Sequence, residues 1–321
     1  MWGPLFRRAG GPPLRRERVD TPDGDFVDLD WLAAPARPGA PLVLALHGLE
    51  GCARSHYVSG VLAHARDAGW RGVALNFRSC SGEPNRRPRF YHSGDTGDLD
   101  HVVRLLVARE PDLRLGVVGV SLGGNVLLKW LGEQGEAAPA AVAAAVGISV
   151  PFDLEACARA LDRGLARRVY TAGFLRTMRR KVVRKARAFP GFVDLAAVRR
   201  ARTFAAYDRA MTAPVHGFAD ELDYWRRSSS AGYLAGIRRP ALLISALDDP
   251  FVPASALPSP ESLPPGVELE VTARGGHVGF VDGRWPWRAE SWAEHRAFAF
   301  LAAVVAAARA AIIREGAAGG G

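Results

Sequence analysis

Short apolar runs alternate along this chain with longer segments in which apolar residues recur at three- and four-residue spacing. The apolar runs cover residues 42–46, 71–77, 117–120, 140–150 and 241–245. Runs of this length between turn-forming residues are typical of buried parallel strands. The segments with helical spacing cover residues 57–69, 98–110 and 122–134. This alternation predicts an α/β fold with a mostly parallel central sheet and helices on both of its faces.

Two segments depart from this alternation. Residues 18–32 read as an antiparallel hairpin around Pro22-Asp23-Gly24, which we expect at an edge of the sheet. From residue 151 to residue 230 no strand pattern recurs, and helical spacing dominates until the next apolar run follows Pro240. Because strands return after this segment, we interpret it as a helical cap inserted into the sheet. The predicted parts are a core of residues 1–150 and 236–321 and an insertion of residues 151–235.

The insertion carries most of the positive charge of the chain. Between Arg159 and Arg202 it holds 14 Lys and Arg against two acids, whereas the whole chain has a net charge of +9. One helical face is apolar and another is basic, as shown by Leu175, Met178 and Val182 against Arg176, Arg180 and Arg184. We hypothesise that the apolar face covers an acyl pocket and that the basic face meets anionic lipid or an anionic substrate.

The alternative is a basic face that only keeps the protein in solution, and the sequence leaves both interpretations open. Identical salt dependence of activity on neutral and on anionic esters would contradict the anionic contact. Nucleic acid is not expected as a partner, because no aromatic-interleaved surface or known binding motif accompanies the charge.

Composition points to a globular protein of one large domain, with 48% hydrophobic and 23% charged residues among 321. No run of 18 apolar residues occurs, and the segment from Met1 to Arg18 mixes arginines with Gly and Pro instead of the apolar core of a secretory signal. We therefore expect a cytoplasmic protein. Its three cysteines are too widely separated to indicate a zinc site or a disulfide framework.

The strongest chemical signal is Gly119-Val120-Ser121-Leu122-Gly123, a Gly-x-Ser-x-Gly pattern between a predicted strand and a predicted helix. A serine on such a sharp turn is exposed as a nucleophile, and the flanking glycines avoid collisions with neighbouring backbone. The alternative is a glycine-rich turn with an incidental serine. The strand and helix on either side favour the nucleophile, so Ser121 is the candidate.

A serine needs a base, and an acid that orients the base. His277 follows Gly275-Gly276 after a predicted strand at 268–273, whereas the other seven histidines lack that context. The acid is expected after the strand at 241–245, where Asp248 and Asp249 compete. Asp249 matches an Asp-x-x-Val-Pro pattern and is preferred as the acid, and Asp248 is better placed to cap the turn.

An ester hydrolase also needs amide donors for the oxyanion. The strand at 42–46 is followed by His47-Gly48-Leu49-Glu50-Gly51, a turn type that accompanies such donors. We predict that the backbone amides of Leu49 and Leu122 are the donors. His47 is expected to shape the turn, not to act as an acid or base.

At this point the chain resembles the YheT-like branch of α/β-hydrolases, which includes plant Emb8-like and animal lung-type hydrolases. The resemblance covers most of the chain and rests on the following segments: 47–51, 76–83 with 85–86, 91–96, 119–125, 149–154, 212–218, 248–251 and 275–280. One departure is Ser79, where many relatives have glycine. The resemblance implies the α/β-hydrolase fold with a helical cap after residue 150, a triad of Ser121, Asp249 and His277, and activity on carboxylic esters.

The resulting hypothesis is a serine carboxylic-ester hydrolase that forms an acyl-enzyme on short- to medium-chain acyl esters or lipids and needs no cofactor or metal. Two alternatives stay open. Acyl transfer to an alcohol or thiol would use the same triad, and product analysis with competing acceptors separates it from hydrolysis. A non-catalytic lipid- or partner-binding module would keep the fold without the chemistry, and reaction with an active-site probe discriminates it.

The charged loop from Arg78 to Asp95 has two interpretations. It could bind a substrate head group, or it could lock a long loop beside the site. We favour the structural interpretation, because networks of charged side chains in loops commonly serve packing.

Overall fold

The computed structural model describes residues 11–282 and 290–318. Within them, eight strands form a sheet in the order β1-β2-β4-β3-β5-β6-β7-β8. β1 pairs antiparallel with β2, and β2 pairs antiparallel with β4, while the remaining pairs are parallel. The strands are β1 Leu14–Asp20, β2 Phe26–Leu32, β3 Leu42–Leu46, β4 Arg71–Asn76, β5 Leu115–Val120, β6 Val142–Ile148, β7 Ala241–Ala246 and β8 Val267–Thr272. The predicted mostly parallel sheet is confirmed.

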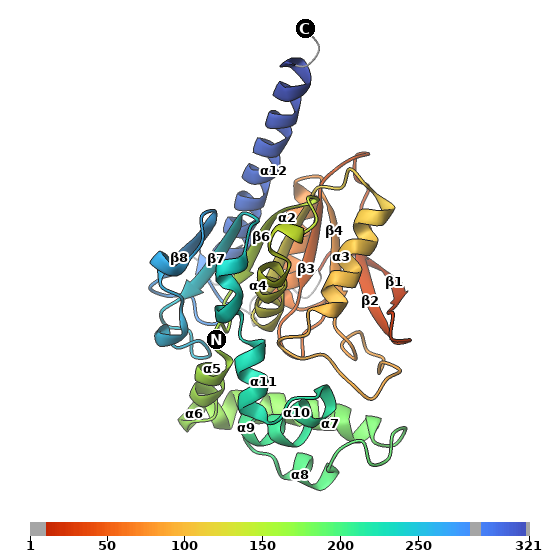
Figure 1. Ribbon diagram of the computed structural model, residues 1–321, viewed down its shortest axis with the longest axis vertical. Helices are drawn as coiled ribbons and strands as arrows, with labels where there is room; N and C mark the ends of the chain where they lie inside the picture. The colour runs from red at the N-terminus through yellow and green to blue at the C-terminus, as the bar shows by residue number, and fades with distance from the viewer. Residues whose placement is uncertain (1–10, 283–289, 319–321) are drawn as a thin grey trace.

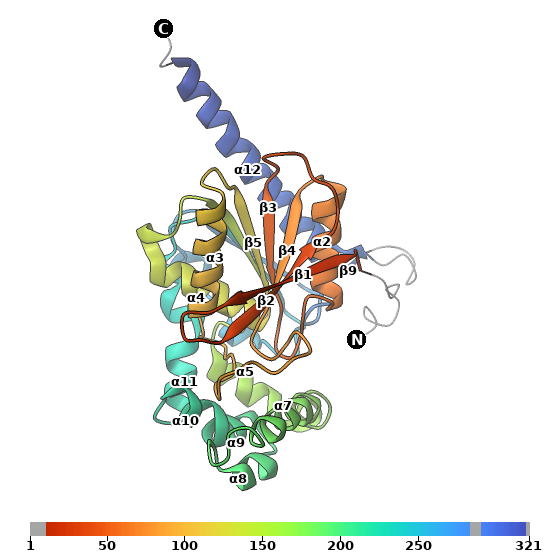
Figure 2. The same ribbon diagram turned by 90° about the vertical axis from the view of Figure 1, so that its right-hand side faces the viewer.

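Helices cover both faces of this sheet (Figure 2). On one face α3, Gly97–Arg109, and α4, Leu122–Gln134, pack against the strands. On the other face lie α2, His56–Asp67, and the first part of α12, Trp292–Ala318. The layered arrangement explains why β3 and β5 are apolar at every position, since both of their faces are covered.

Strand β3 illustrates this at the level of single residues. Leu42, Leu44 and Leu46 belong to the apolar cluster with α3 and α4, whereas Val43 and Ala45 belong to the cluster with α2 and α12. Successive side chains of a strand point to opposite faces, so a strand buried on both sides needs an unbroken apolar run. All five side chains are at most 2% exposed.

The hairpin at the sheet edge begins earlier than its apolar pattern predicts, at Leu14 instead of residue 18. Leu14 pairs with Leu32, and the turn includes Gly24 with φ 78°. β1 is an edge strand whose side chains are mostly exposed, so arginines are tolerated there. These arginines interrupt the apolar pattern from which a strand is predicted. Residues 1–10, part of the amino-terminal segment considered above, lie outside the described residues.

The segment between β6 and β7 is helical, and no strand occurs in it within the described residues. Figure 1 shows its helices gathered at one end of the sheet, below the strands. They are α5 Leu154–Leu161, α6 Gly164–Ala166, η2 Arg167–Thr171, α7 Ala172–Lys185, α8 Leu195–Arg200, α9 Phe204–Tyr207, η3 Asp208–Thr212, α10 Ala213–His216 and α11 Glu221–Ser228. The exact boundaries of core and insertion stay a prediction.

Helix α7 has the two faces that its sequence indicates. Leu175 and Val182 are buried, and Arg176, Arg180 and Arg184 are exposed. The buried residues of the insertion form an apolar cluster that also includes Phe90 of the core.

The remaining regular elements are short. They are η1 Gly135–Ala137, η4 Ser230–Gly236, η5 Ala254–Ala256, η6 Pro260–Ser262 and a two-stranded pair of β9 Val281–Asp282 with β10 Glu290–Ser291. Among the helices described, none combines the length and the apolar character that a membrane span requires.

Candidate active site

The turn between β5 and α4 holds Ser121 in a conformation that few residues adopt. Its φ is 54° and its ψ is −122°, a combination outside the backbone regions favoured by residues other than glycine. A Cβ at Gly119 would lie 2.5 Å from the carbonyl oxygen of Gly123, and one at Gly123 would lie 2.6 Å from that of His47. The two glycines are therefore needed for β5, α4 and the β3 loop to approach closely around Ser121.

Ser121, His277 and Asp249 form a continuous chain of hydrogen bonds. His277 Nε2 is 2.8 Å from Ser121 Oγ, and His277 Nδ1 is 2.8 Å from Asp249 Oδ2. The Phe251 ring stacks on the imidazole with 4.2 Å between ring centroids. Asp249 Oδ1 also accepts hydrogen bonds from the amides of Phe251 and Val252. The carboxylate and the imidazole are thus held in one orientation.

The neighbouring Asp248 makes different contacts. Its Oδ1 accepts hydrogen bonds of 2.7 and 2.8 Å from the amides of Gly275 and Gly276, directly before His277. Hydrogen bonding from the Gly276 amide, together with that from Gly275, lowers the pKa of the Asp248 carboxyl. Asp248 therefore fastens the loop that carries the histidine, and Asp249 contacts the histidine itself.

The loop after β3 presents an amide next to Ser121. The Gly48 amide donates to Tyr57 Oη at 3.0 Å, and the Glu50 amide donates to Tyr91 Oη at 2.8 Å. In the part of the chain that the structure describes, the amides of Leu49 and Leu122 donate to no protein acceptor. Both residues line the cavity that also contains Ser121 and His277. Two amide donors are consequently free for a ligand in that cavity.

His47 lies beneath this loop and is fully buried. Its Nε2 accepts a hydrogen bond from the Phe77 amide, and its Nδ1 donates to the Gly48 carbonyl. Burial lowers the pKa of the imidazole to about 4. A neutral ring that bridges two backbone segments supports the shape of the turn.

Above the triad lies a cavity of about 640 Å³, within the range of small-molecule sites. The insertion supplies most of its apolar wall, including Leu154, Leu161, Phe174, Met178, Phe204 and Trp225. Asp208 is a buried carboxyl in the same wall, and burial raises its pKa to about 7. The wall is therefore largely apolar, with the buried carboxyl of Asp208 in it.

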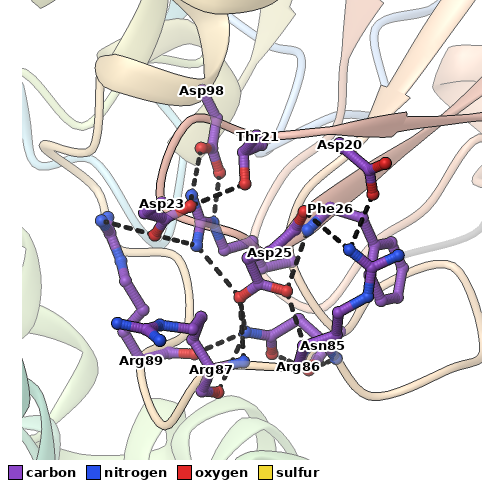
Figure 3. Close-up of polar contacts among 12 residues, drawn as sticks. Asp20, Thr21, Asp23, Asp25, Phe26, Asn85, Arg86, Arg87, Arg89 and Asp98 are labelled. Carbon is purple, nitrogen blue, oxygen red and sulfur yellow. Dashed lines mark hydrogen bonds and ion pairs between the residues drawn. The ribbon is translucent and has the colours of Figure 1, made fainter.

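The charged loop after β4 forms a buried network with the β1–β2 turn (Figure 3). Arg78 bonds to Asp98 at 2.6 Å, to Asp23 at 2.8 Å and to Asp25 at 3.0 Å. Asn85 bonds to Asp25 as well. Because Arg78 is only 3% exposed and does not line the cavity, this geometry favours the structural interpretation for the arginine network, whereas Tyr91, His92 and Ser93 of the same loop do line the cavity.

Sequence reasoning missed the side chains that hold the reactive groups in place: Tyr57, Tyr91 and Phe251. Phe251 lies two positions after Asp249, with Pro250 between them, and this nearness to a candidate acid is the signal that could have identified it. The two tyrosines carry no comparable pattern. Within the described residues, His, Cys, Asp and Glu do not gather into a group of three or more that could hold a metal ion.

Comparison with known proteins gives a family match that covers most of the chain. The sequence profile of a family described as "alpha/beta hydrolase fold" matches residues 41–284. The chain is 43% identical over 282 residues to "Putative esterase YheT" of Escherichia coli, covering 87% of this chain and 82% of that protein. It is 31% identical over 287 residues to "Phospholipase ABHD3" of Mus musculus, covering 86% of this chain and 69% of that protein.

A solved structure shows the same fold at lower sequence identity. The Pyrococcus furiosus esterase Pf2001 aligns with a TM-score of 0.57 and 19% identity, over 90% of this chain and 92% of that one. The expected resemblance to YheT-like proteins is confirmed by the sequence relatives, and the expected fold by the structure.

Proposed function

This chain belongs to the α/β-hydrolase fold family, and from that premise we propose that it is a serine carboxylic-ester hydrolase. Its similarity to proteins named as an esterase and a phospholipase supports this class of reaction. The observation that carries the proposal is the hydrogen-bonded chain from Ser121 through His277 to Asp249, at the base of an apolar cavity.

The proposed reaction follows from the orientation of His277. Because Nδ1 faces the Asp249 carboxylate and donates to it, Nε2 is the nitrogen that accepts the proton of Ser121. Ser121 Oγ then attacks the ester carbonyl, and the alcohol leaves with the proton that His277 returns. Water, deprotonated by His277, attacks the acyl-enzyme, which releases the acid and restores Ser121.

The negative charge on the carbonyl oxygen needs donors in both tetrahedral steps. We assign this role to the backbone amides of Leu49 and Leu122, because both are without a protein acceptor in the described structure and both line the cavity. Leu122 begins α4, so the positive end of that helix also faces the developing charge.

The proposed substrates are short- to medium-chain acyl esters or lipids. The apolar side chains that the insertion contributes would cover an acyl chain and exclude water from the ester. The basic surface of α7 and α8 borders a shallow hollow formed by Arg179, Arg180, Arg184, Arg187 and Arg199 together with Val183. Contact of this surface with an anionic membrane and a cytoplasmic location both stay predictions.

The test is reaction with a fluorophosphonate probe, followed by intact mass and peptide mapping. We expect one adduct on Ser121 in the wild type, no adduct in Ser121→Ala, and turnover of p-nitrophenyl esters only where the adduct forms. Ser93→Ala is the matched control, because Ser93 lines the same cavity and should leave labelling of Ser121 intact. A folded wild type that neither reacts with the probe nor hydrolyses esters would contradict the proposal and favour a binding module.

A further inference from the structure

We propose that Lys181 of the insertion is a positioning residue for catalysis, which holds the loop carrying the Leu49 amide by means of an ion pair with Glu50. The inference rests on the proposed function, since it concerns the same oxyanion donors. It assigns a role to two charged residues that the triad does not use, one from each side of the boundary between core and insertion.

The loop after β3 contains a turn in a strained form. The Gly51 amide donates to the Gly48 carbonyl at 3.0 Å, so Leu49 and Glu50 are the two central residues of a four-residue turn. Glu50 has a φ of 57°, at the position where turns with positive φ normally take glycine. A side chain in this conformation costs about 1–2 kcal/mol, so surrounding contacts must maintain it.

Those contacts come from two side chains around Glu50. Lys181 Nζ donates to Glu50 Oε1 at 2.7 Å, and Tyr91 Oη, which accepts from the Glu50 amide, is 3.3 Å from the same oxygen. The Glu50 side chain is 10% exposed and that of Lys181 is 28% exposed. A carboxylate buried to this extent depends on its cation, because loss of the partner leaves an uncompensated charge.

Helix α7 itself is fastened to the core one turn further on, through Lys185. Lys185 Nζ donates to the carbonyls of Arg87 and Arg89 and to the side chain of Asn85, and it lies 4.2 Å from the centroid of the Phe90 ring. Asn85, Arg87 and Arg89 belong to the loop drawn in Figure 3. Lys185 therefore holds α7 against the core. Because Lys181 lies one turn earlier on the same helix, these contacts also position Lys181.

These contacts couple docking of the insertion to the geometry of the oxyanion site. If Glu50 relaxed to a negative φ, the peptide between Leu49 and Glu50 would rotate, and the Glu50 amide would leave Tyr91 Oη. The turn that presents the Leu49 amide would then lose its defined position. Since an oxyanion donor acts only at hydrogen-bond distance from the developing charge, the loss should appear in the chemical step and not in substrate binding.

The first experiment compares Lys181→Met with Lys181→Arg and with Arg226→Met, an exposed arginine of α11 that pairs with Asp223. With p-nitrophenyl butyrate, we expect kcat of Lys181→Met to fall about 10–100-fold, less than the loss of a whole oxyanion donor, with KM within about twofold of wild type. Lys181→Arg, which keeps the charge, should recover most of kcat. Arg226→Met should match the wild type, because Arg226 does not line the cavity.

The second measurement separates positioning from general loosening of the structure. A trifluoromethyl ketone adds to the serine and forms an oxyanion, whereas the matching methyl ketone binds mainly without adding. The inhibition constant of the trifluoromethyl ketone should rise in Lys181→Met by the same factor by which kcat/KM falls, while that of the methyl ketone stays constant. Equal weakening of both ketones, a rise in KM alone, or an unchanged kcat would overturn the proposal.

Two outcomes need separate interpretation. If Lys181→Met does not fold, the double variant Glu50→Gln/Lys181→Met removes both charges and should fold with the same loss of kcat. A folded double variant with wild-type kcat would overturn the role of the ion pair. An inactive wild type that resists fluorophosphonate would contradict the proposed function itself, whereas an active wild type with an equally active Lys181→Met would contradict only the role of Lys181.

Discussion

Two adjacent aspartates show how much one residue position decides in this site. Asp248 and Asp249 have the same chemistry and lie at the end of the same strand, yet only Asp249 is bonded to His277. Asp248 bonds to the amides of Gly275 and Gly276 and is exposed, whereas the side chain of Asp249 is 1% exposed. Consecutive side chains after a strand point in different directions, so their surroundings differ completely.

We expect Asp249→Asn to reduce kcat by about 10³–10⁴-fold, because an amide in place of the carboxylate favours the wrong histidine tautomer. Asp248→Asn should change kcat only a few-fold, since an amide oxygen still accepts the hydrogen bonds from Gly275 and Gly276. Steady-state kinetics on p-nitrophenyl butyrate measures both. Losses of similar size in the two variants would mean that the assignment of the acid is wrong.

At the scale of secondary-structure elements, the turn from β5 to α4 is the most constrained part of the site. Three segments meet there, and a Cβ at Gly123 would lie 2.6 Å from the His47 carbonyl oxygen and 2.7 Å from that of Leu46. Backbone atoms at such distances cannot move aside without displacing β3. The Gly-x-Ser-x-Gly pattern is therefore a requirement of helix–strand packing as much as of catalysis.

Gly123→Ala should consequently destabilise the fold by about 2–4 kcal/mol, a size typical of strain in a packed core, and should abolish most of the esterase activity. Gly173→Ala is the contrasting case, because no atom lies within 4 Å of its added Cβ on helix α7. There alanine should stabilise by up to about 1 kcal/mol through its helix propensity. Urea unfolding of the two variants checks the contrast, which a stable Gly123→Ala would refute.

At the scale of the whole molecule, one buried arginine joins three distant parts of the core. Arg78 bonds to Asp23 and Asp25 in the β1–β2 turn and to Asp98 in α3. Burial opposes ionisation of Asp25, but hydrogen bonds from Asn85 and from the Arg86 amide outweigh it and lower its pKa. Burial raises the pKa of Asp98, so the three carboxyls do not contribute alike.

Removing the arginine should be costly at neutral pH and less so in acid. Asp25 has a lowered pKa in the folded state, so its stabilisation is complete above the unfolded value of about 4 and is lost as the pH falls further. Arg78→Met leaves buried carboxylates without their cation and should cost about 3–5 kcal/mol at pH 7. As the pH falls, the carboxyls of Asp23 and Asp25 stay ionised in the folded wild type because their pKa values are lowered, whereas the variant without the cation takes up protons on them, so the difference should shrink.

The measurement is the free energy of unfolding in urea at pH 7 and at pH 3.5. Arg86→Met serves as the control, because the Arg86 side chain is 49% exposed in its pair with Asp20 and should contribute less than about 1 kcal/mol. A difference between wild type and Arg78→Met that grows toward acid pH would contradict this account of the network.

Residue order by itself determined the parallel strands, the helices that cover them, the serine turn and the helical character of the insertion. These features follow from local periods and glycine positions, so a short window of sequence contains them. The start of β1 was not predicted from the sequence, because an edge strand tolerates arginine. The candidate triad also came from sequence, but its hydrogen bonds did not.

Only the tertiary structure decided which groups meet. It brought Ser121 within 2.8 Å of a histidine 156 positions away and set Lys181 against Glu50 across 131 positions. It also set Asp249, which the sequence pattern already preferred, against His277, and Asp248 against the amides of Gly275 and Gly276. Such contacts depend on how whole elements pack, and the local pattern around either partner does not indicate them. A charged side chain in a loop or on a helix face looks the same in sequence whether it faces water or a partner.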